Sequence, residues 1–205
     1  MPDFLERAVS GRAKCRGCGR AIDKGDLRFG ESLPNPYREG ESVHWFHLTC
    51  AACMRPEKTR DMLRSPAEPV PDRAWLESAI DQGIAHERLA ELARAERSPS
   101  GRARCQQCRE FVEKGVWRFS LHIFQEGRMS PIGCIHVGCA EAYFGTEDLV
   151  DRVRRLSPDL TEGDLAEIAR LLAEPARAPL AKGRGEKSGE EPIDTEDGET
   201  HRTAG

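Results

Sequence analysis

The sequence lacks the features that a large hydrophobic core, a membrane span or an export signal would require. Apolar residues make up 38% of its 205 residues and aromatic residues only 6%, so one large core is not expected. It contains no stretch of about 18 apolar residues, so we expect no membrane-spanning helix and no membrane partner. The opening residues, MPDFLERAVSGRAK, lack the apolar centre of a signal peptide, which favours an intracellular protein.

Signatures of catalysis are also missing. The sequence has neither a phosphate-binding P-loop nor a glycine-rich dinucleotide-binding motif. It has no recognisable Ser-His-Asp arrangement and no metal site with an open coordination position. The acidic residues fall on predicted helices, where a solvated surface is the ordinary interpretation. We therefore expect a binding protein rather than an enzyme.

The net charge of −4 does not by itself indicate a nucleic-acid-binding protein. The charge is unevenly distributed, however. Residues 1–60 hold 11 Lys and Arg against 8 Asp and Glu, and residues 98–145 hold 6 against 4. The remaining segments are acidic. Because long-range attraction of DNA depends on local potential, the placement of the cations matters more than the total charge.

A 20-residue segment occurs twice in the chain. Residues 10–29 read SGRAKCRGCGRAIDKGDLRF, and residues 100–119 read SGRARCQQCREFVEKGVWRF. Each copy contains Cys-x-x-Cys and is followed by His-x-x-Cys about 30 residues later. Eight cysteines without an export signal favour metal binding over a disulfide framework. A repeat of this kind predicts two modules of one type.

Each module offers zinc four donors, which suits its tetrahedral coordination. The first set is Cys15, Cys18, His47 and Cys50, and the second is Cys105, Cys108, His136 and Cys139. With all four ligands supplied by protein, both Zn²⁺ ions are expected to be structural.

A competing four-cysteine site would use Cys53 in place of His47. The repeat argues against it, because Ala142 occupies the position that matches Cys53. Cys134 matches Trp45 and is likewise no shared ligand. We expect Cys53 and Cys134 to be small buried apolar residues.

The predicted fold class is small α+β zinc-stabilised modules, each a short antiparallel sheet with helices. Helical spacing runs through residues 72–97, with Asp72 as its N-cap, and a second helix is expected after an N-cap at Thr146. Thr161 and Asp164 resemble a capping box for a third helix. The expected divisions are a first zinc module at 1–60, a Pro-rich and helical linker at 61–97, a second zinc module at 98–145, C-terminal helices at 146–174 and a disordered tail at 175–205.

The modules resemble the zinc finger of poly(ADP-ribose) polymerases, which is also attached to a eukaryotic DNA ligase and a plant DNA 3′-phosphoesterase. The resemblance rests on S-G-R-A-x-C-x-x-C, K-G-x-x-R-F and, in the first module, H-W-F-H-x-x-C. It covers about half of the chain and includes nothing of the polymerase's catalytic domain. It implies two tandem fingers that recognise DNA strand breaks rather than sequence, in repair or damage signalling.

The resemblance also implies DNA-contacting residues. Arg12 and Arg28, repeated as Arg102 and Arg118, match positions that contact phosphates in the family. Stacking on an exposed base-pair face is assigned to loop residues. The candidates are Tyr37 in the first finger and Phe124 and Met129 in the second. Lys14, Arg16, Arg20 and Arg104 surround the two Cys-x-x-Cys motifs, where additional phosphate contacts and a solvated surface are equally good interpretations.

The partners implied are broken DNA and a separate repair enzyme, such as a ligase or an end-processing enzyme. The protein would act in the nucleus of a eukaryote, or in the cytoplasm and nucleoid of a bacterium. Two alternatives stay open. One is a zinc-stabilised protein-interaction adaptor without DNA binding, and the other is a thiol redox sensor that uses Cys53 and Cys134.

Overall fold

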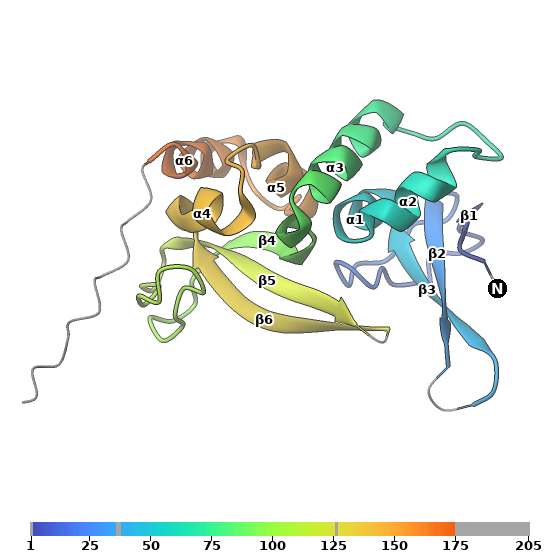
Figure 1. Cartoon of the computed structure of the whole chain (residues 1–205), viewed down its shortest axis with the longest axis horizontal. Coiled ribbons are helices and arrows are strands. Elements are labelled where there is room, and N and C mark those ends of the chain that lie inside the picture. Colours follow the sequence, from blue (N-terminus) through green and yellow to red (C-terminus); the bar gives the residue numbers. More distant parts are fainter. Residues whose placement is uncertain (1, 36–37, 126, 175–205) are drawn as a thin grey trace, which may run out of the picture.

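The first half of the chain begins with a three-stranded antiparallel sheet (Figure 1). The computed structural model describes residues 2–35, 38–125 and 127–174. Tyr37 and the tail expected at 175–205 lie outside these described residues. The strands follow one another in the sheet and are β1 (Phe4–Arg7), β2 (Leu27–Pro34) and β3 (Glu41–His47).

The second half repeats this sheet. Its strands are β4 (Leu92–Arg97), β5 (Trp117–Gln125) and β6 (Arg128–His136), again antiparallel and in chain order. The short antiparallel sheet predicted for each module is therefore confirmed. In each sheet a buried phenylalanine of the central strand faces a buried residue of the third strand: Phe29 faces Phe46, and Phe119 faces Ile135.

Each sheet is followed by three helices. Figure 1 shows the helices along one side of the molecule and the two sheets along the other. Short 3-10 helices, η1 (Glu87–Glu91) and η2 (Val137–Cys139), precede β4 and the fourth α-helix. The α-helices are α1 (Leu48–Met54), α2 (Pro56–Leu63), α3 (Arg73–Ala85), α4 (Ala140–Phe144), α5 (Val150–Leu156) and α6 (Glu162–Leu172).

One helix prediction is wrong. The helical spacing through residues 72–97 holds only as far as Ala85, and Leu92–Arg97 forms strand β4. Leu92, Ala95 and their neighbours pair with β5 instead of continuing the helix. The second sheet therefore starts inside the segment that was expected to be a helical linker. Short apolar runs fit helix and strand periods equally well, so the pairing partner decides between them.

The helix caps differ from expectation in two cases and agree in one. Asp72 precedes α3 but has φ 50° and makes no side-chain cap; its carboxylate accepts a hydrogen bond from Arg155 instead (2.8 Å). The helix expected after Thr146 begins only at Val150. Thr161 and Asp164 form the capping box that the sequence predicts for α6.

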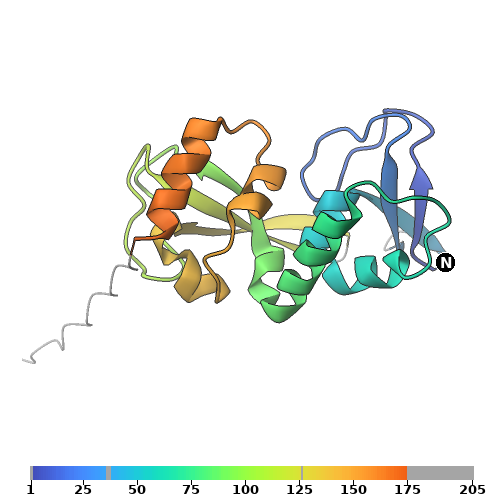
Figure 2. The same cartoon turned by 90° about the horizontal axis from the view of Figure 1, so that it is seen from above.

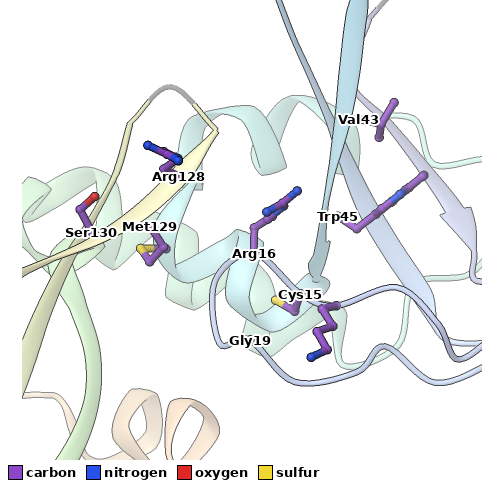
Figure 3. A pocket seen from close by; sticks show the side chains of 9 residues that line it. Cys15, Arg16, Gly19, Val43, Trp45, Arg128, Met129 and Ser130 are labelled. Atoms are coloured by element: carbon purple, nitrogen blue, oxygen red, sulfur yellow. The ribbon is translucent and has the colours of Figure 1, made fainter. Parts of the chain in front are cut away.

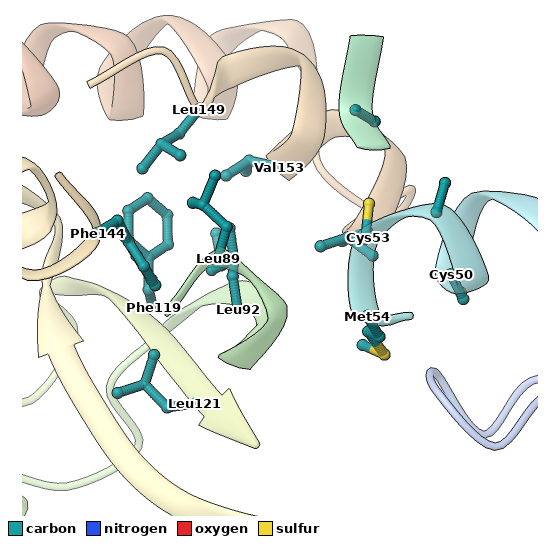
Figure 4. Packing of buried hydrophobic residues seen from close by; sticks show 14 of the residues in the cluster. Cys50, Cys53, Met54, Leu89, Leu92, Phe119, Leu121, Phe144, Leu149 and Val153 are labelled. Carbon is teal, nitrogen blue, oxygen red and sulfur yellow. The ribbon is translucent and has the colours of Figure 1, made fainter. Parts of the chain in front are cut away.

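The two halves share one hydrophobic core. Figure 4 shows Leu89, Phe119 and Phe144 packed together in the second half, with Cys53 and Met54 of α1 lying to one side of them. Figure 2 shows α3 lying between the two sheets. No helix within the described residues is long and apolar enough to cross a bilayer.

Candidate metal centres and nucleic-acid interface

The four donors of the first module meet between a turn, a strand and a helix. Cys15 and Cys18 lie in a tight turn, here called the first knuckle (residues 15–18). His47 ends β3, and Cys50 lies in α1. The donor atoms of these four residues all lie within 4.8 Å of one another. The turn closes through a hydrogen bond from the Gly19 N–H to the Cys15 carbonyl (2.8 Å), with Gly19 at φ 74°, which glycine adopts without strain.

The second module builds the same cluster. Cys105 and Cys108 form the second knuckle (residues 105–108), His136 ends β6, and Cys139 ends η2. Their donor atoms also lie within 4.8 Å of one another. Both sets hold three sulfurs and one imidazole, the donor set of a closed structural zinc site. The prediction of two Zn²⁺ ions, each bound by three cysteines and one histidine, is confirmed.

Both ligand histidines are oriented by their second nitrogen. The Nδ1 of His47 lies 3.4 Å from the Cys18 sulfur, and the Nδ1 of His136 lies 3.3 Å from the Cys108 sulfur. Nε2 of each ring points away and bonds the carbonyl of Ala21 (3.0 Å) or Phe111 (3.2 Å). A proton fixed on Nε2 leaves the Nδ1 lone pair for the metal. The geometry therefore fits zinc bound through Nδ1 at both sites.

The electrostatics of the clusters also favour a cation. A hydrogen bond from the Cys139 thiol lowers the pKa of Cys105 to about 3. Hydrogen bonds involving Cys15 and then Cys50 hold the pKa of Cys18 far below its usual value. Cys15 and Cys18 together raise the pKa of His47 to about 10. Hydrogen bonds with the neighbouring sulfurs raise the pKa of Cys50 and of Cys139. Each cluster therefore favours thiolate at one sulfur and keeps a proton on another, and zinc would replace these protons and the one on His47.

Cys53 and Cys134 belong to neither cluster. Cys53 is fully buried and Cys134 is 2% exposed, and burial raises the pKa of both thiols. The expectation that they are small buried apolar residues is confirmed, and the four-cysteine alternative is wrong. Cys134 lies opposite Ser120, where the first sheet has Trp45 opposite Gly30. The second sheet therefore exchanges a large-small pair for two small side chains.

Arg28, an expected phosphate contact, is largely covered. It is 6% exposed, lies opposite Glu6 in the register of β1 and β2, and forms an ion pair with that carboxylate. Its guanidinium carbon lies 3.5 Å from the centroid of the Trp45 ring. Its Nε is buried and has no hydrogen-bond partner among the described residues. The structure thus places Arg28 between a carboxylate and an aromatic ring.

Arg118 has the matching arrangement in the second sheet. It lies opposite Glu96 and donates two hydrogen bonds to that carboxylate (3.1 and 2.6 Å). Burial alone would raise the pKa of Glu96. The hydrogen bond from Arg118 and the charges of Arg94 and Arg118 outweigh burial and hold the pKa below its usual value. Glu6 and Glu96 were not singled out from the sequence, although they too are separated by 90 residues.

Arg12 in the first module and its counterpart Arg102 in the second are both exposed. Neither forms an ion pair within the part of the chain that the structure describes. They differ in this from Arg28 and Arg118, which have carboxylate partners. Of the four arginines expected from the repeat, Arg28 and Arg118 are therefore covered by carboxylate partners. The other two are exposed cations without an ion pair in the described part of the structure.

The candidate stacking residues of the second finger, expected in a loop, lie instead on strands β5 and β6 at the junction of the two halves. The Phe124 ring meets the Phe46 ring edge to face, with centroids 5.2 Å apart at 82°. It also lies 6.0 Å from the ring of His44. Met129 is partly exposed and lines a cleft beside the first knuckle. Arg128, on the same strand as Met129, is a cation of this cleft that the sequence analysis did not select.

Known proteins with similar sequences include zinc-finger proteins, which is consistent with the two metal clusters. Residues 6–84 match the family described as the poly(ADP-ribose) polymerase and DNA-ligase zinc-finger region. Poly [ADP-ribose] polymerase 1 of Gallus gallus is 29% identical over 137 residues, which cover 58% of this chain and 13% of the relative. The poly [ADP-ribose] polymerase of Sarcophaga peregrina is 25% identical over 224 residues, which cover 96% of this chain and 22% of the relative.

These matches thus reach only a minor part of the relatives' length. A Drosophila melanogaster poly [ADP-ribose] polymerase is 36% identical over a shorter stretch of 50 residues, 24% of this chain and 5% of the relative. The matched residues hold the first set of metal ligands, and the second half repeats the sheet, the helices and the ligand set. Residues 6–84 thus resemble the zinc finger of the poly(ADP-ribose) polymerase and DNA-ligase family, and the second half of the chain repeats their fold and their metal ligands.

Proposed function

We propose that this protein binds DNA through its two zinc fingers and recognises strand breaks, acting in DNA repair or damage signalling. The observation that carries the proposal is the set of open cations at the knuckles. They are exposed and form no ion pair among the described residues. The set includes Arg12, Lys14, Arg16 and Arg102. Cations without carboxylate partners are free to neutralise phosphates and release counterions.

The covered arginines have a different role in this proposal. Arg118 keeps part of its side chain exposed (15%) while Glu96 holds it, so it can still offer a donor to a phosphate. Arg28 is more deeply covered and mainly fixes the Trp45 ring next to the first knuckle. Zinc fixes the knuckles, so the cations keep their spacing in the absence of DNA. The metal contributes to binding through this geometry and takes no part in a reaction.

The proposed partners follow from the family. A strand break held by the fingers would be passed to a separate repair enzyme, such as a ligase or an end-processing enzyme. The protein would then act where the DNA is, in a nucleus or a nucleoid. Tyr37 and Met129 are kept as proposed stacking residues, whereas Phe124 is engaged between the two halves.

The test compares a nicked duplex with the same duplex sealed, at matched salt, with zinc-loaded and metal-stripped protein. We expect zinc-dependent preference for the nick. The variants Arg12→Gln and Arg102→Gln should each weaken binding and reduce the salt slope by about 1. Arg154→Gln is the matched control, because Arg154 is exposed on α5 and paired with Glu162. Equal affinity for both duplexes, or none, contradicts the proposal.

One observation favours an adaptor function as a second candidate. Phe111 is 50% exposed and Val116 is 37% exposed, which is unusual in a chain with few aromatic residues. They line a cavity of about 150 Å³ next to His136. Exposed apolar side chains that share a hollow are typical of protein contact sites. If DNA binding is absent, Phe111→Ser becomes the variant with which to search for a lost protein partner.

A further inference from the structure

A cleft of about 740 Å³ lies between the two fingers, beside the first metal cluster, whose ligand Cys15 belongs to its lining (Figure 3). One wall is the first knuckle together with β3, and the other wall is the beginning of β6. Its volume falls within the range of about 300–1,000 Å³ that is usual for ligand sites. Its lining comprises Lys14, Cys15, Arg16, Gly19, Val43, Trp45, Arg128, Met129 and Ser130.

The walls are fixed by contacts between the two halves. Phe124, at the end of β5, packs against Phe46 of the first sheet. Gly127 lies so close to the His44 ring that a Cβ there would come within 2.5 Å of it. The Arg55 guanidinium covers the Phe124 ring from 4.9 Å. The hairpin of the second finger is thus seated on the first finger, and the cleft exists before any ligand arrives.

The lining combines positive charge with apolar surface. Lys14, Arg16 and Arg128 are exposed and form no ion pair within the described part of the chain. The lining contains no acidic side chain among the described residues. Trp45 and Met129 are partly exposed and belong to opposite walls of the cleft. Cations beside apolar and aromatic surface match a phosphate that is attached to a base.

We propose that the cleft binds one unpaired nucleotide of a DNA strand, at a gap, flap or overhang next to the break. This inference rests on the proposed function. Arg16 and Arg128 hold the phosphate from the two sides, and the base lies against Met129 and Trp45. A nucleotide inside a duplex is stacked and paired, so only an unpaired one offers a free base without an unpairing cost.

The occupant is part of a strand rather than a free nucleotide. Arg12 is also exposed and precedes Lys14 by two residues in the chain, so in this proposal it meets a neighbouring phosphate of the same strand. A free nucleotide would leave this cation without a ligand. The fixed cleft also means that one break is contacted by both fingers of one molecule.

The experiment measures affinity for a nicked duplex and for the same duplex with a one-nucleotide flap at the nick. Base stacking predicts roughly tenfold tighter binding of the flap. Arg128→Gln should remove most of that gain and leave the affinity for the plain nick nearly unchanged. Met129→Ala should remove the gain and also weaken binding to the nick, because Met129 is a proposed stacking residue. Lys114→Gln is the matched control, since Lys114 is exposed in the second module and outside the cleft. Zinc content of two ions per chain verifies that each variant is folded.

A photo-crosslinking flap base locates the nucleotide directly, and we expect its adduct on Met129 or Trp45. Equal binding of flap and nick, or an adduct elsewhere, overturns the cleft assignment while break sensing stands. Loss of binding to every broken duplex instead overturns the proposed function. If a free deoxynucleoside monophosphate competes for the cleft as strongly as the flap strand does, the proposal that the occupant is part of a strand is overturned.

Discussion

Arg152 donates a hydrogen bond to the carbonyl oxygen of Cys53, at 3.3 Å and across 99 residues of sequence. The same guanidinium donates to the carbonyl of Ala79 (2.6 Å) and to the side chain of Gln82 (3.2 Å). Arg152 is 2% exposed. Arg152 is thus a buried cation of α5 whose hydrogen bonds join this helix to α1 and α3 of the other half. The two fingers therefore pack as one unit rather than as two modules joined by a flexible linker.

Replacing this cation should destabilise the whole chain. Arg152→Leu leaves buried carbonyl groups without a donor, at about 1–3 kcal/mol for each. We therefore expect the free energy of unfolding of the zinc-loaded protein to fall by about 3 kcal/mol, as measured by urea denaturation. Arg154→Leu, on the exposed side of the same helix, should leave the midpoint unchanged. Equal effects of the two variants would show that the halves do not depend on Arg152.

The number of bound zinc ions should depend on the cysteines of the two clusters and not on Cys53 or Cys134. Cys18→Ser and Cys108→Ser should each reduce the metal from two ions to one, as measured by native mass spectrometry. Cys53→Ala and Cys134→Ala should keep both ions, because neither thiol lies in a cluster. Structural zinc contributes about 10–16 kcal/mol of apparent binding free energy, so chelation should unfold the chain. Loss of an ion in Cys53→Ala would contradict the ligand assignment.

The thiol of Cys53 should be unreactive in the folded protein. It is fully buried, and burial raises its pKa, so little of the reactive thiolate is present at neutral pH. Iodoacetamide should leave Cys53 unmodified in the zinc-loaded chain and should reach all eight cysteines after chelation. Mild peroxide should likewise release no zinc. Rapid oxidation of Cys53 with zinc loss would instead support the redox-sensor alternative.

Gly30, which lies opposite Trp45, should tolerate no larger side chain, whereas the matching position of the second sheet, Ser120, lies opposite the smaller Cys134. A Cβ on Gly30 would lie 2.8 Å from Cζ3 of Trp45 and 3.1 Å from Phe4. Gly30→Ala should therefore displace the ring that Arg28 stacks on and cost about 1–3 kcal/mol in thermal or urea unfolding. Ser120→Ala is the matched change in the second sheet, where Cys134 lies opposite. It should have little effect, and a larger loss there than at Gly30 would contradict this account.

Some expectations were met because the physics that decides them is local in sequence. Thr161 and Asp164 cap α6 through hydrogen bonds spanning three residues. Leu92 and its neighbours were assigned to a helix because their apolar period is short and ambiguous. Their strand exists only because β5 pairs with it. Glu31 gave no signal in the sequence, yet it is fully buried in contact with Arg55 and Lys58, which come from a later part of the chain.

The sequence by itself determined the metal ligands, the duplication and the exclusion of Cys53, since a tetrahedral site accepts only a few spacings and a repeat tests each of them twice. Only the tertiary structure decided that Arg28 and Arg118 are held by Glu6 and Glu96 and that the two fingers share a core. The reason is that ion pairs across strands and packing between halves depend on which surfaces meet. That meeting is set by the sum of many weak contacts between residues far apart in the chain, and no single motif records it.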